Sequence, residues 1–434
     1  KLRLPRAQLV FSPLTVLSAH SMVEEPHPMR FFLFAISFAL GIASCLVQAQ
    51  EQPFLSTRAW TSSEGQTLRA TLTRVTARSV LLKVARTGKV IEIPVERLSA
   101  ADRQATAAWL KDNPDGLVPP RPPYRWPDRY RGEQQPKVTY ARYDEQQRAH
   151  VFSARYYNLL SDNKLSESTV SRCATVFDAI VGALDSLPLA LSPVPLEGEN
   201  RYQAFLLSSR AEYQRRGGPP NSAGVYIPSR NLTMMPYSSL GIVKKGSNWV
   251  FDGNRRDFGV LIHELTHQAL IKRWGFLPVW FHEGIAEYMQ AMPYRSGQFL
   301  FTNPGAAVSK HIRDGIGRAY REFPCTRLEN LLTIEHRMWN QVNAIDPRRS
   351  LRNYASAEIA VWYFMHSDGA GDGADFISWI HALKRAARTD GRNWPARKRA
   401  LTEKHLLRGR SWEDVEAEIG KSVREKGLRV VFAR

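Results

Sequence analysis

The chain has 434 residues, three cysteines and a formal net charge of +19. This length is enough for two or three domains, and so few cysteines argue against a disulfide scaffold or a zinc site built from cysteine. The positive charge alone would suit binding to nucleic acid, but no recognised nucleic-acid-binding pattern appears in the sequence. A basic surface suits anionic polymers or lipid head groups equally well. We therefore expect no nucleic-acid partner.

The first informative segment is a short apolar run at 31–43, directly after Met29-Arg30. The run is too short to predict a membrane span, and the small-residue pattern ending at Ala49 is typical of a cleavage site. We therefore expect a secretory signal peptide at 29–49, preceded by a non-native upstream extension at 1–28. The protein is then extracytoplasmic: secreted, periplasmic or envelope-associated.

The segment Ile42-Ala-Ser-Cys45 offers an alternative processing site, because it resembles a bacterial lipobox. Acylation of Cys45 would make the protein a lipoprotein and tether it to a membrane, and we expect membrane contact only in that case. Cys173 and Cys325 then remain in a compartment that permits disulfides, and the sequence leaves open whether they form one.

An all-β module is predicted at 56–111, where apolar and polar residues alternate over several short stretches. Thr87-Gly88 predicts a tight hairpin between two of the strands. Ser99 is expected to cap a short helix that ends the module. Proline-rich sequence at 112–137 predicts an extended, semi-rigid linker.

This module resembles the Sla-type homology domain 1, which is an SH3-like barrel. The resemblance rests on Arg58-x-Trp60-Thr-Ser, the Gly88-Lys-Val hairpin and the ending Val95-x-x-Leu98-Ser-x-x-Asp102. It implies a small N-terminal barrel. Eukaryotic relatives of this fold bind short peptide motifs, so the module is expected to serve either as an interaction module with a protein ligand or as an anchoring module, and the identity of any ligand stays open.

A second domain is expected at 138–434. The sequence predicts a strand at 149–153, a helix at 168–187 and further strands at 201–209 and 223–237.

The run His263-Glu-Leu-Thr-His267 is the most informative motif of the chain. Apolar residues around it predict a helix with one buried side, and positions i and i+4 of a helix project from the same face. His263 and His267 can therefore hold one metal ion between them. Glu264 is then placed to take a proton from an attacking water. The alternative interpretation is a buried helix with two core histidines.

A third ligand is needed, because catalytic zinc usually takes three protein ligands and leaves one position for water. Glu283 is the predicted ligand, on a second helix that should start after Pro278. The small residues Gly284 and Ala286 would let this helix approach the first. Glu287, one turn further, is expected to accept the other ring N–H of a ligand histidine, although an exposed helix charge is the alternative.

From 297 onward the sequence predicts mostly helices, near 328–332, 354–366, 376–383 and 412–419. The helix that includes Tyr354 is expected to pack behind the metal. A mixed sheet followed by helices gives the predicted fold class, α+β.

The two motifs together resemble the peptidase MA-like gluzincin domains: His263-Glu-Leu-Thr-His267 is followed by Trp280-Phe-His-Glu-Gly-Ile-Ala-Glu-Tyr288. In that family the first motif supplies two ligands and a general base, and the later Glu-Gly-x-Ala-Glu stretch supplies the third ligand. The metzincin pattern is excluded, because the chain has Leu270 and Arg273 where that pattern needs Gly and His or Asp.

The gluzincin resemblance implies a zincin-like domain that binds one Zn²⁺ through His263, His267 and Glu283. It also implies hydrolysis of peptide bonds in a peptide or protein substrate, with Glu264 as the general base. The sequence leaves open whether such an enzyme acts as an endopeptidase or an exopeptidase.

Gluzincins also use a Tyr or His to stabilise the oxyanion that develops on the attacked carbonyl. Tyr354 is the first candidate, and Tyr288, His311 and His366 are the alternatives. Backbone near 224–226 could hold the substrate by strand addition or belong to an ordinary sheet strand.

A non-catalytic function is the alternative to the enzyme. In it, a secreted interaction protein keeps a structural zinc site while the SH3-like module binds a peptide. The intact Glu264 argues against this alternative, because a structural site needs no base and usually closes its fourth position with another ligand. The sequence therefore favours a secreted zinc metallopeptidase.

Overall fold

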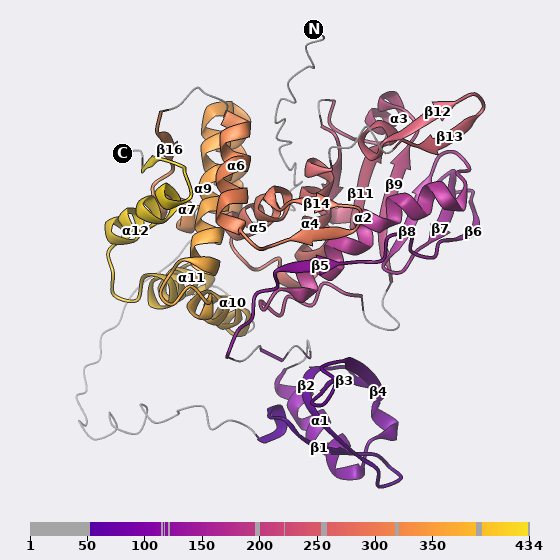
Figure 1. The fold of residues 1–434 in the computed structure, drawn as a ribbon, viewed down its shortest axis with the longest axis vertical. Coiled ribbons are helices and arrows are strands. Elements are labelled where there is room, and N and C mark those ends of the chain that lie inside the picture. The colour runs from indigo at the N-terminus through magenta and orange to yellow at the C-terminus, as the bar shows by residue number, and fades with distance from the viewer. Residues whose placement is uncertain are drawn as a thin grey trace, which may run out of the picture. The chain divides into compact units, whose positions relative to one another are not determined.

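A computed structural model describes residues 53–113, 116, 118–119, 122–195, 200–220, 222–252, 258–316, 321–387 and 393–432 (Figure 1). The expected upstream extension, signal peptide and lipidation site Cys45 lie outside these residues. The described chain forms two compact units, one up to residue 119 and one from residue 122 onward. Helices and strands together confirm the α+β class. In the part of the chain that the structure describes, no helix is long and apolar enough to cross a membrane.

The smaller unit is an antiparallel sheet with one helix. Its strands pair in the order β1 (Arg58–Thr61), β2 (Thr67–Val75), β3 (Ser79–Val84) and β4 (Val90–Pro94), and α1 (Ala100–Asp112) follows. Among the described residues of this unit, β1 and β4 do not pair, so the sheet is not a closed barrel. Two short 3-10 turns, Pro53–Leu55 and Val95–Arg97, complete the unit.

Local sequence explains the turns of the smaller unit. Gly88 adopts a left-handed φ of +66° in the hairpin between β3 and β4, as predicted from Thr87-Gly88. The Ser99 side chain accepts a hydrogen bond from the Asp102 amide and caps α1, as predicted. Trp60 is 1% exposed and lies in the core of the unit.

The larger unit is built on a six-stranded mixed sheet. Its strands are β6 (Thr139–Asp144), β7 (Ala149–Ser153), β8 (Tyr157–Ser161), β9 (Tyr202–Leu207), β10 (Val225–Ile227) and β11 (Leu232–Pro236), in the order β10-β11-β9-β8-β7-β6. β8, β9 and β11 run parallel, and β10 runs antiparallel to β11 at the edge of the sheet.

The segment 223–237, which was expected to form one strand, instead forms the hairpin of β10 and β11. A 3-10 turn at Pro228–Arg230 interrupts it, and Asn231 then adopts a left-handed φ of 46°. Proline cannot donate to a ladder, and Asn tolerates the left-handed region, so these two residues end one strand and begin the next.

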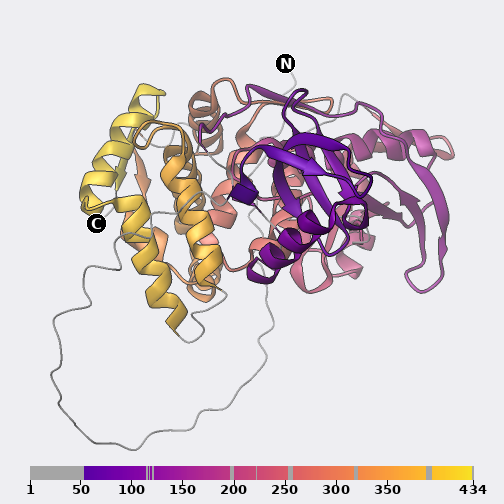
Figure 2. The ribbon, with the colours of Figure 1, turned by 90° about the horizontal axis from the view of Figure 1, so that it is seen from below.

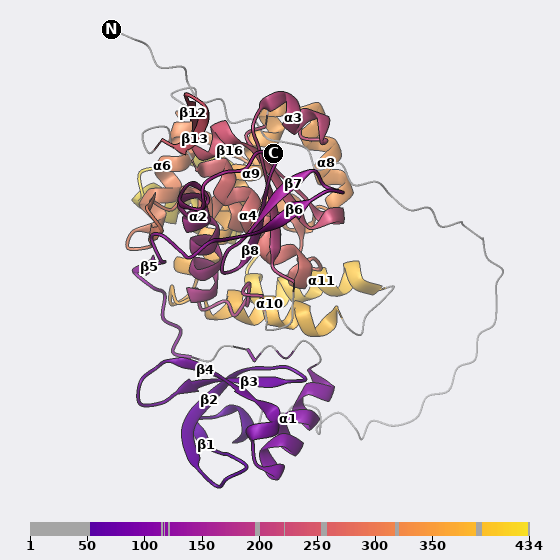
Figure 3. The ribbon, with the colours of Figure 1, turned by 90° about the vertical axis from the view of Figure 1, so that its right-hand side faces the viewer.

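Two long helices lie on the sheet and pack against each other: α2 (Glu167–Ser186) and α4 (Gly259–Trp274) (Figure 3). Ser166 caps α2. The buried Gln268 side chain ties α4 to the sheet, because its amide nitrogen donates to the carbonyls of Gln203 and Asn231 at 2.8 and 3.0 Å. Its oxygen accepts from the Thr233 hydroxyl at 2.8 Å. α4 is thereby held in register with β9 and β11.

Short elements surround this layer: α3 (Arg210–Arg215), the 3-10 turn Tyr237–Leu240, the hairpin of β12 (Ile242–Lys245) and β13 (Asn248–Phe251), and the sheet of β5 (Arg129–Arg131), β15 (Gln298–Leu300) and β14 (Tyr294–Arg295). β5 falls within the segment 112–137 that was expected to be a linker. It is extended, as proline-rich sequence favours, but it hydrogen-bonds to β15 as part of the larger unit.

The C-terminal part is helical, and its helices lie together beside the sheet layer (Figure 2). They are α5 (Val279–Ala291), α6 (Pro304–Ile316), α7 (Leu328–Thr333), α8 (His336–Ile345), α9 (Pro347–His366), α10 (Ala374–Ala386), α11 (Trp394–Thr402), the π-helical turn Glu403–Leu407 and α12 (Trp412–Glu425), with β16 (Phe323–Cys325) pairing β17 (Val430–Phe432). The four predicted helices are confirmed as α7, α9, α10 and α12. Cys173 and Cys325 are buried free thiols and do not form the disulfide that the sequence left open.

The helix α5 packs closely against α9, and Gly284 lies at this contact. A Cβ at Gly284 would overlap the carbonyl oxygen of Ala357 and lie 2.6 Å from the Val361 side chain. We expected Gly284 to let α5 approach α4, but the space that it leaves is filled by α9.

Gly284→Ala is therefore expected to lower the free energy of unfolding by about 1–3 kcal/mol, because the new methyl group must displace the α9 backbone. Gly420→Ala in α12 is the matched control. No atom lies within 4 Å of a Cβ there, so removal of a helical glycine should raise stability by about 0.5–1 kcal/mol. Urea unfolding of both variants measures the difference. Equal midpoints for Gly284→Ala and the parent would contradict the tight α5–α9 contact.

Candidate metal centre

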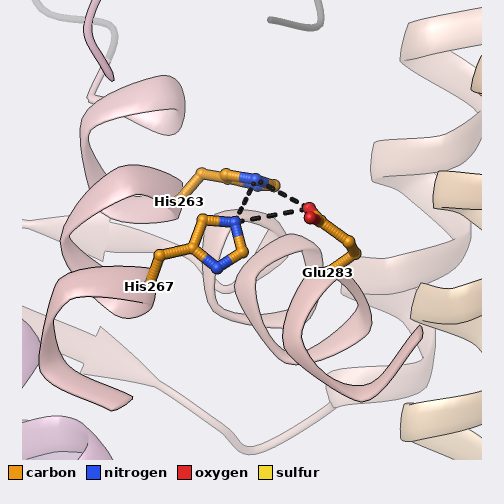
Figure 4. A group of neighbouring side chains, drawn as sticks. All are labelled: His263, His267 and Glu283. Carbon is orange, nitrogen blue, oxygen red and sulfur yellow. Dashed lines mark hydrogen bonds and ion pairs between the residues drawn. The ribbon is translucent and has the colours of Figure 1, made fainter. Parts of the chain in front are cut away.

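Two histidines project from the same face of α4. His263 and His267 are one turn apart, and their Nε2 atoms lie 3.0 Å from each other (Figure 4). Two neutral imidazoles can share at most one proton across such a contact. Nitrogens gathered this closely are suited to bind a common cation.

The third member of the cluster comes from α5. Pro278 precedes the first turn of this helix, as predicted, and the His282 imidazole Nε2 lies 3.0 Å from the Trp274 carbonyl at the end of α4. Glu283 is thereby directed at the histidine pair: its Oε2 lies 3.4 Å from Nε2 of His263 and 3.3 Å from Nε2 of His267.

The electrostatics of the cluster favour an ionised Glu283. Burial alone would raise the pKa of this carboxyl, but His267 and His263 outweigh burial and hold the pKa below its usual range. Burial also opposes protonation of His267, yet Glu283 raises the pKa of that imidazole. For His263 burial dominates and lowers the pKa. The cluster thus offers one carboxylate and two imidazoles.

Glu264 lies on the α4 turn between the two histidines and reaches the edge strand β10. Its Oε2 accepts the backbone N–H of Tyr226 at 2.7 Å. Burial raises the pKa of Glu264 to about 7, against the opposing effects of His267 and the Tyr226 amide. A carboxylate with a pKa near neutrality is suited to accept and return a proton.

Glu287 lies one turn beyond Glu283, and its Oε1 is 3.4 Å from Nδ1 of His263. This is the position expected for a carboxylate that orients a ligand histidine. It is 4% exposed, so the exposed helix charge considered as its alternative is wrong. Burial raises the pKa of Glu287 to about 8, although the neighbouring His311 opposes the shift.

Of the four residues considered for the oxyanion, Tyr354 on α9 lies beside the cluster. Its ring centroid is 6.3 Å from that of His263, and Trp339 packs edge-on against its other side at 5.3 Å. Burial, followed by the charge of Glu283, raises the pKa of Tyr354 well above 10, so the phenol keeps its proton and can donate it in a hydrogen bond.

Tyr288 and His366 bond to each other instead, with the Tyr288 hydroxyl 2.9 Å from His366 Nε2. Trp126 packs edge-on against His366 at 4.4 Å. His311 lies on α6, where its Nδ1 is 3.1 Å from both carboxylate oxygens of Glu358. The sequence reasoning missed Glu358. The only signal was a single acidic residue inside the apolar run of the α9 helix.

The residues of the cluster fit a zinc ion. His263, His267 and Glu283 each offer a ligand atom, and these atoms lie within 4.8 Å of one another. Among the described residues, Oε2 of the buried Glu283 has no hydrogen-bond partner, which is costly unless a cation binds there. No family model matches the chain, and no curated protein matches it either. Any inference about the chemistry of the site therefore rests on the geometry of its own residues.

Proposed function

We propose that the protein is a zinc-dependent metallopeptidase of the gluzincin type. The observation that carries the proposal is the convergence of His263, His267 and Glu283, with Glu264 on the intervening turn of α4. Two histidines and a glutamate form a zinc ligand set that leaves one position open, and a zinc ion bound there would polarise the scissile carbonyl and acidify the attacking water.

Residues around the triad supply the general base, the oxyanion donor and the orientation of a ligand histidine. Glu264 accepts the proton of the attacking water and returns it to the leaving amine, for which its neutral-range pKa is suited. Tyr354 donates its phenolic proton in a hydrogen bond to the oxyanion. Glu287, with Oε1 3.4 Å from Nδ1 of His263, helps to orient this ring so that Nε2 faces the ligand position.

The edge strand β10 supports a peptide as the substrate. β10 pairs with β11 on one side, and the Tyr226 N–H points away from that ladder to Glu264. An extended peptide could add to this edge near 224–226 with its backbone beside the base. This is the substrate-binding mode that we propose.

For the smaller unit we propose a role as an interaction module like the Sla-type homology domain 1. The buried Trp60, the hairpin at Gly88 and the helix capped by Ser99 support the likeness. We also propose export of the protein by the segment 29–49, with membrane attachment only if Cys45 is acylated.

Metal analysis combined with a peptide-library assay tests the proposed function. Purified protein should hold one zinc per chain and cleave peptides, and a chelator should abolish cleavage until zinc is restored. The variant His263→Ala should lose both the zinc and the activity. A parent that holds one zinc but cleaves no peptide would favour the interaction protein with a structural zinc, and a parent without zinc would contradict both functions.

A further inference from the structure

A series of alternating imidazoles and carboxylates, with both carboxylates buried, extends from the triad into the helical part. Nδ1 of His263 lies 3.4 Å from Oε1 of Glu287. The other oxygen of Glu287, Oε2, lies 3.9 Å from Nδ1 of His311, and this nitrogen is 3.1 Å from each oxygen of Glu358. The series thus joins α4, α5, α6 and α9.

The His311 ring lies between two buried carboxyl groups. Glu287 and Glu358 are 4% and 1% exposed, and buried carboxyl groups are costly unless a neighbouring polar group pairs with them. Nδ1 of His311 faces both. Burial opposes protonation of His311, but Glu358 and Glu287 outweigh burial and raise the pKa of the imidazole to about 9.

We propose that His311 and Glu358 are positioning residues of the metal centre, which act on His263 through Glu287. The Glu287 carboxylate lies between the two rings, with Oε1 3.4 Å from Nδ1 of His263 and Oε2 3.9 Å from Nδ1 of His311. The His311 ring therefore limits how far this carboxylate can turn away from His263. A carboxylate held beside Nδ1 of His263 favours the ring orientation in which Nε2 faces the proposed metal position. Glu358 in turn fixes the His311 ring, since Nδ1 is equidistant from its two oxygens.

This inference rests on the proposed function, because it assigns His311 and Glu358 to the same metal centre. Neither residue contacts the triad in the structure, so neither is a catalytic residue. Loss of such an outer partner commonly weakens metal binding by about ten- to a hundred-fold.

The inference is tested by measuring zinc dissociation constants through competition with a chelating dye. Four proteins are compared: the parent, His311→Leu, His311→Asn and His336→Leu. We expect His311→Leu to raise the dissociation constant about ten- to a hundred-fold. His311→Asn, which keeps an N–H donor near the position of Nδ1, should recover part of this loss. His336 is exposed on α8, and its replacement should change nothing.

The absorption spectrum of the cobalt-substituted protein gives a readout that a purely structural role would not alter. A shifted spectrum in His311→Leu would support altered ligand geometry at His263. Should His311→Leu fail to fold, Glu358→Gln keeps the volume of the side chain and a hydrogen bond to His311, and we expect it to raise the zinc dissociation constant as well.

Two results would overturn the inference while leaving the proposed function intact. The first is a His311→Leu variant whose zinc affinity and cobalt spectrum both equal those of the parent. If only Glu358→Gln folds, an unchanged zinc affinity in that variant has the same meaning. The other is two zinc ions per parent chain with one lost in His311→Leu, which would make Glu287, His311 and Glu358 a second metal site. A parent that binds no zinc would instead contradict the proposed function itself.

Discussion

A Glu264→Gln protein is expected to bind zinc as tightly as the parent and to hydrolyse peptides about a hundred to ten thousand times more slowly. Glutamine keeps the shape of the side chain, and its oxygen can still accept the Tyr226 N–H that Glu264 accepts at 2.7 Å. The amide cannot take a proton from water near neutral pH. The change should therefore remove the base without disturbing the metal ligands or the edge strand.

The measurement is kcat/KM on the best peptide of the library, together with zinc content. Glu425→Gln, an exposed glutamate of α12, is the control and should match the parent in both. Unchanged hydrolysis by zinc-loaded Glu264→Gln would exclude Glu264 as the base and leave the mechanism without its proton acceptor.

Removal of Glu283 is expected to abolish tight zinc binding and the stabilisation that zinc gives. At a free zinc concentration a thousand times the dissociation constant, the ion should stabilise the parent by about 4 kcal/mol, and Glu283→Ala should gain little of this. The physical reason is that His263 and His267 alone provide two ligands on one helix, whereas Glu283 supplies the third from α5.

Thermal unfolding with and without zinc measures this effect. Glu425→Ala controls for the loss of one surface carboxylate and should keep the full zinc-induced shift in Tm. The same shift in Glu283→Ala would mean that another residue completes the ligand set, and the adjacent Glu287 would be the first to examine.

The motif residues could be predicted because their relation is set by local helix geometry. His263 and His267 share a face by the i, i+4 rule, and Pro278 marks the start of the helix that carries Glu283. The same rule gave Glu287 its position one turn later. In each case a few neighbouring residues determine where the side chain points.

The partners that lie far away in the sequence could not be predicted. Gly284 was expected to face α4, but it meets α9. His311 was an alternative to Tyr354 for the oxyanion, but it pairs with Glu358. Both differences arise from how α5, α6 and α9 pack, which the apolar pattern of one helix does not specify. The turn between β10 and β11, by contrast, could have been predicted from local sequence, because Pro228 and Asn231 are both residues that end strands.

The burial of α5 on all sides links the proposed metal site to the packing of the C-terminal helices. From Val279 to Met289 every residue of this helix is buried, with Glu283 turned to α4 and the adjacent Gly284 turned to α9. The two histidines of α4 can meet in a partly formed chain, but the carboxylate reaches them only after α5 has entered the core. If the proposed zinc site is correct, complete coordination of the ion would require α5 to be packed between α4 and α9.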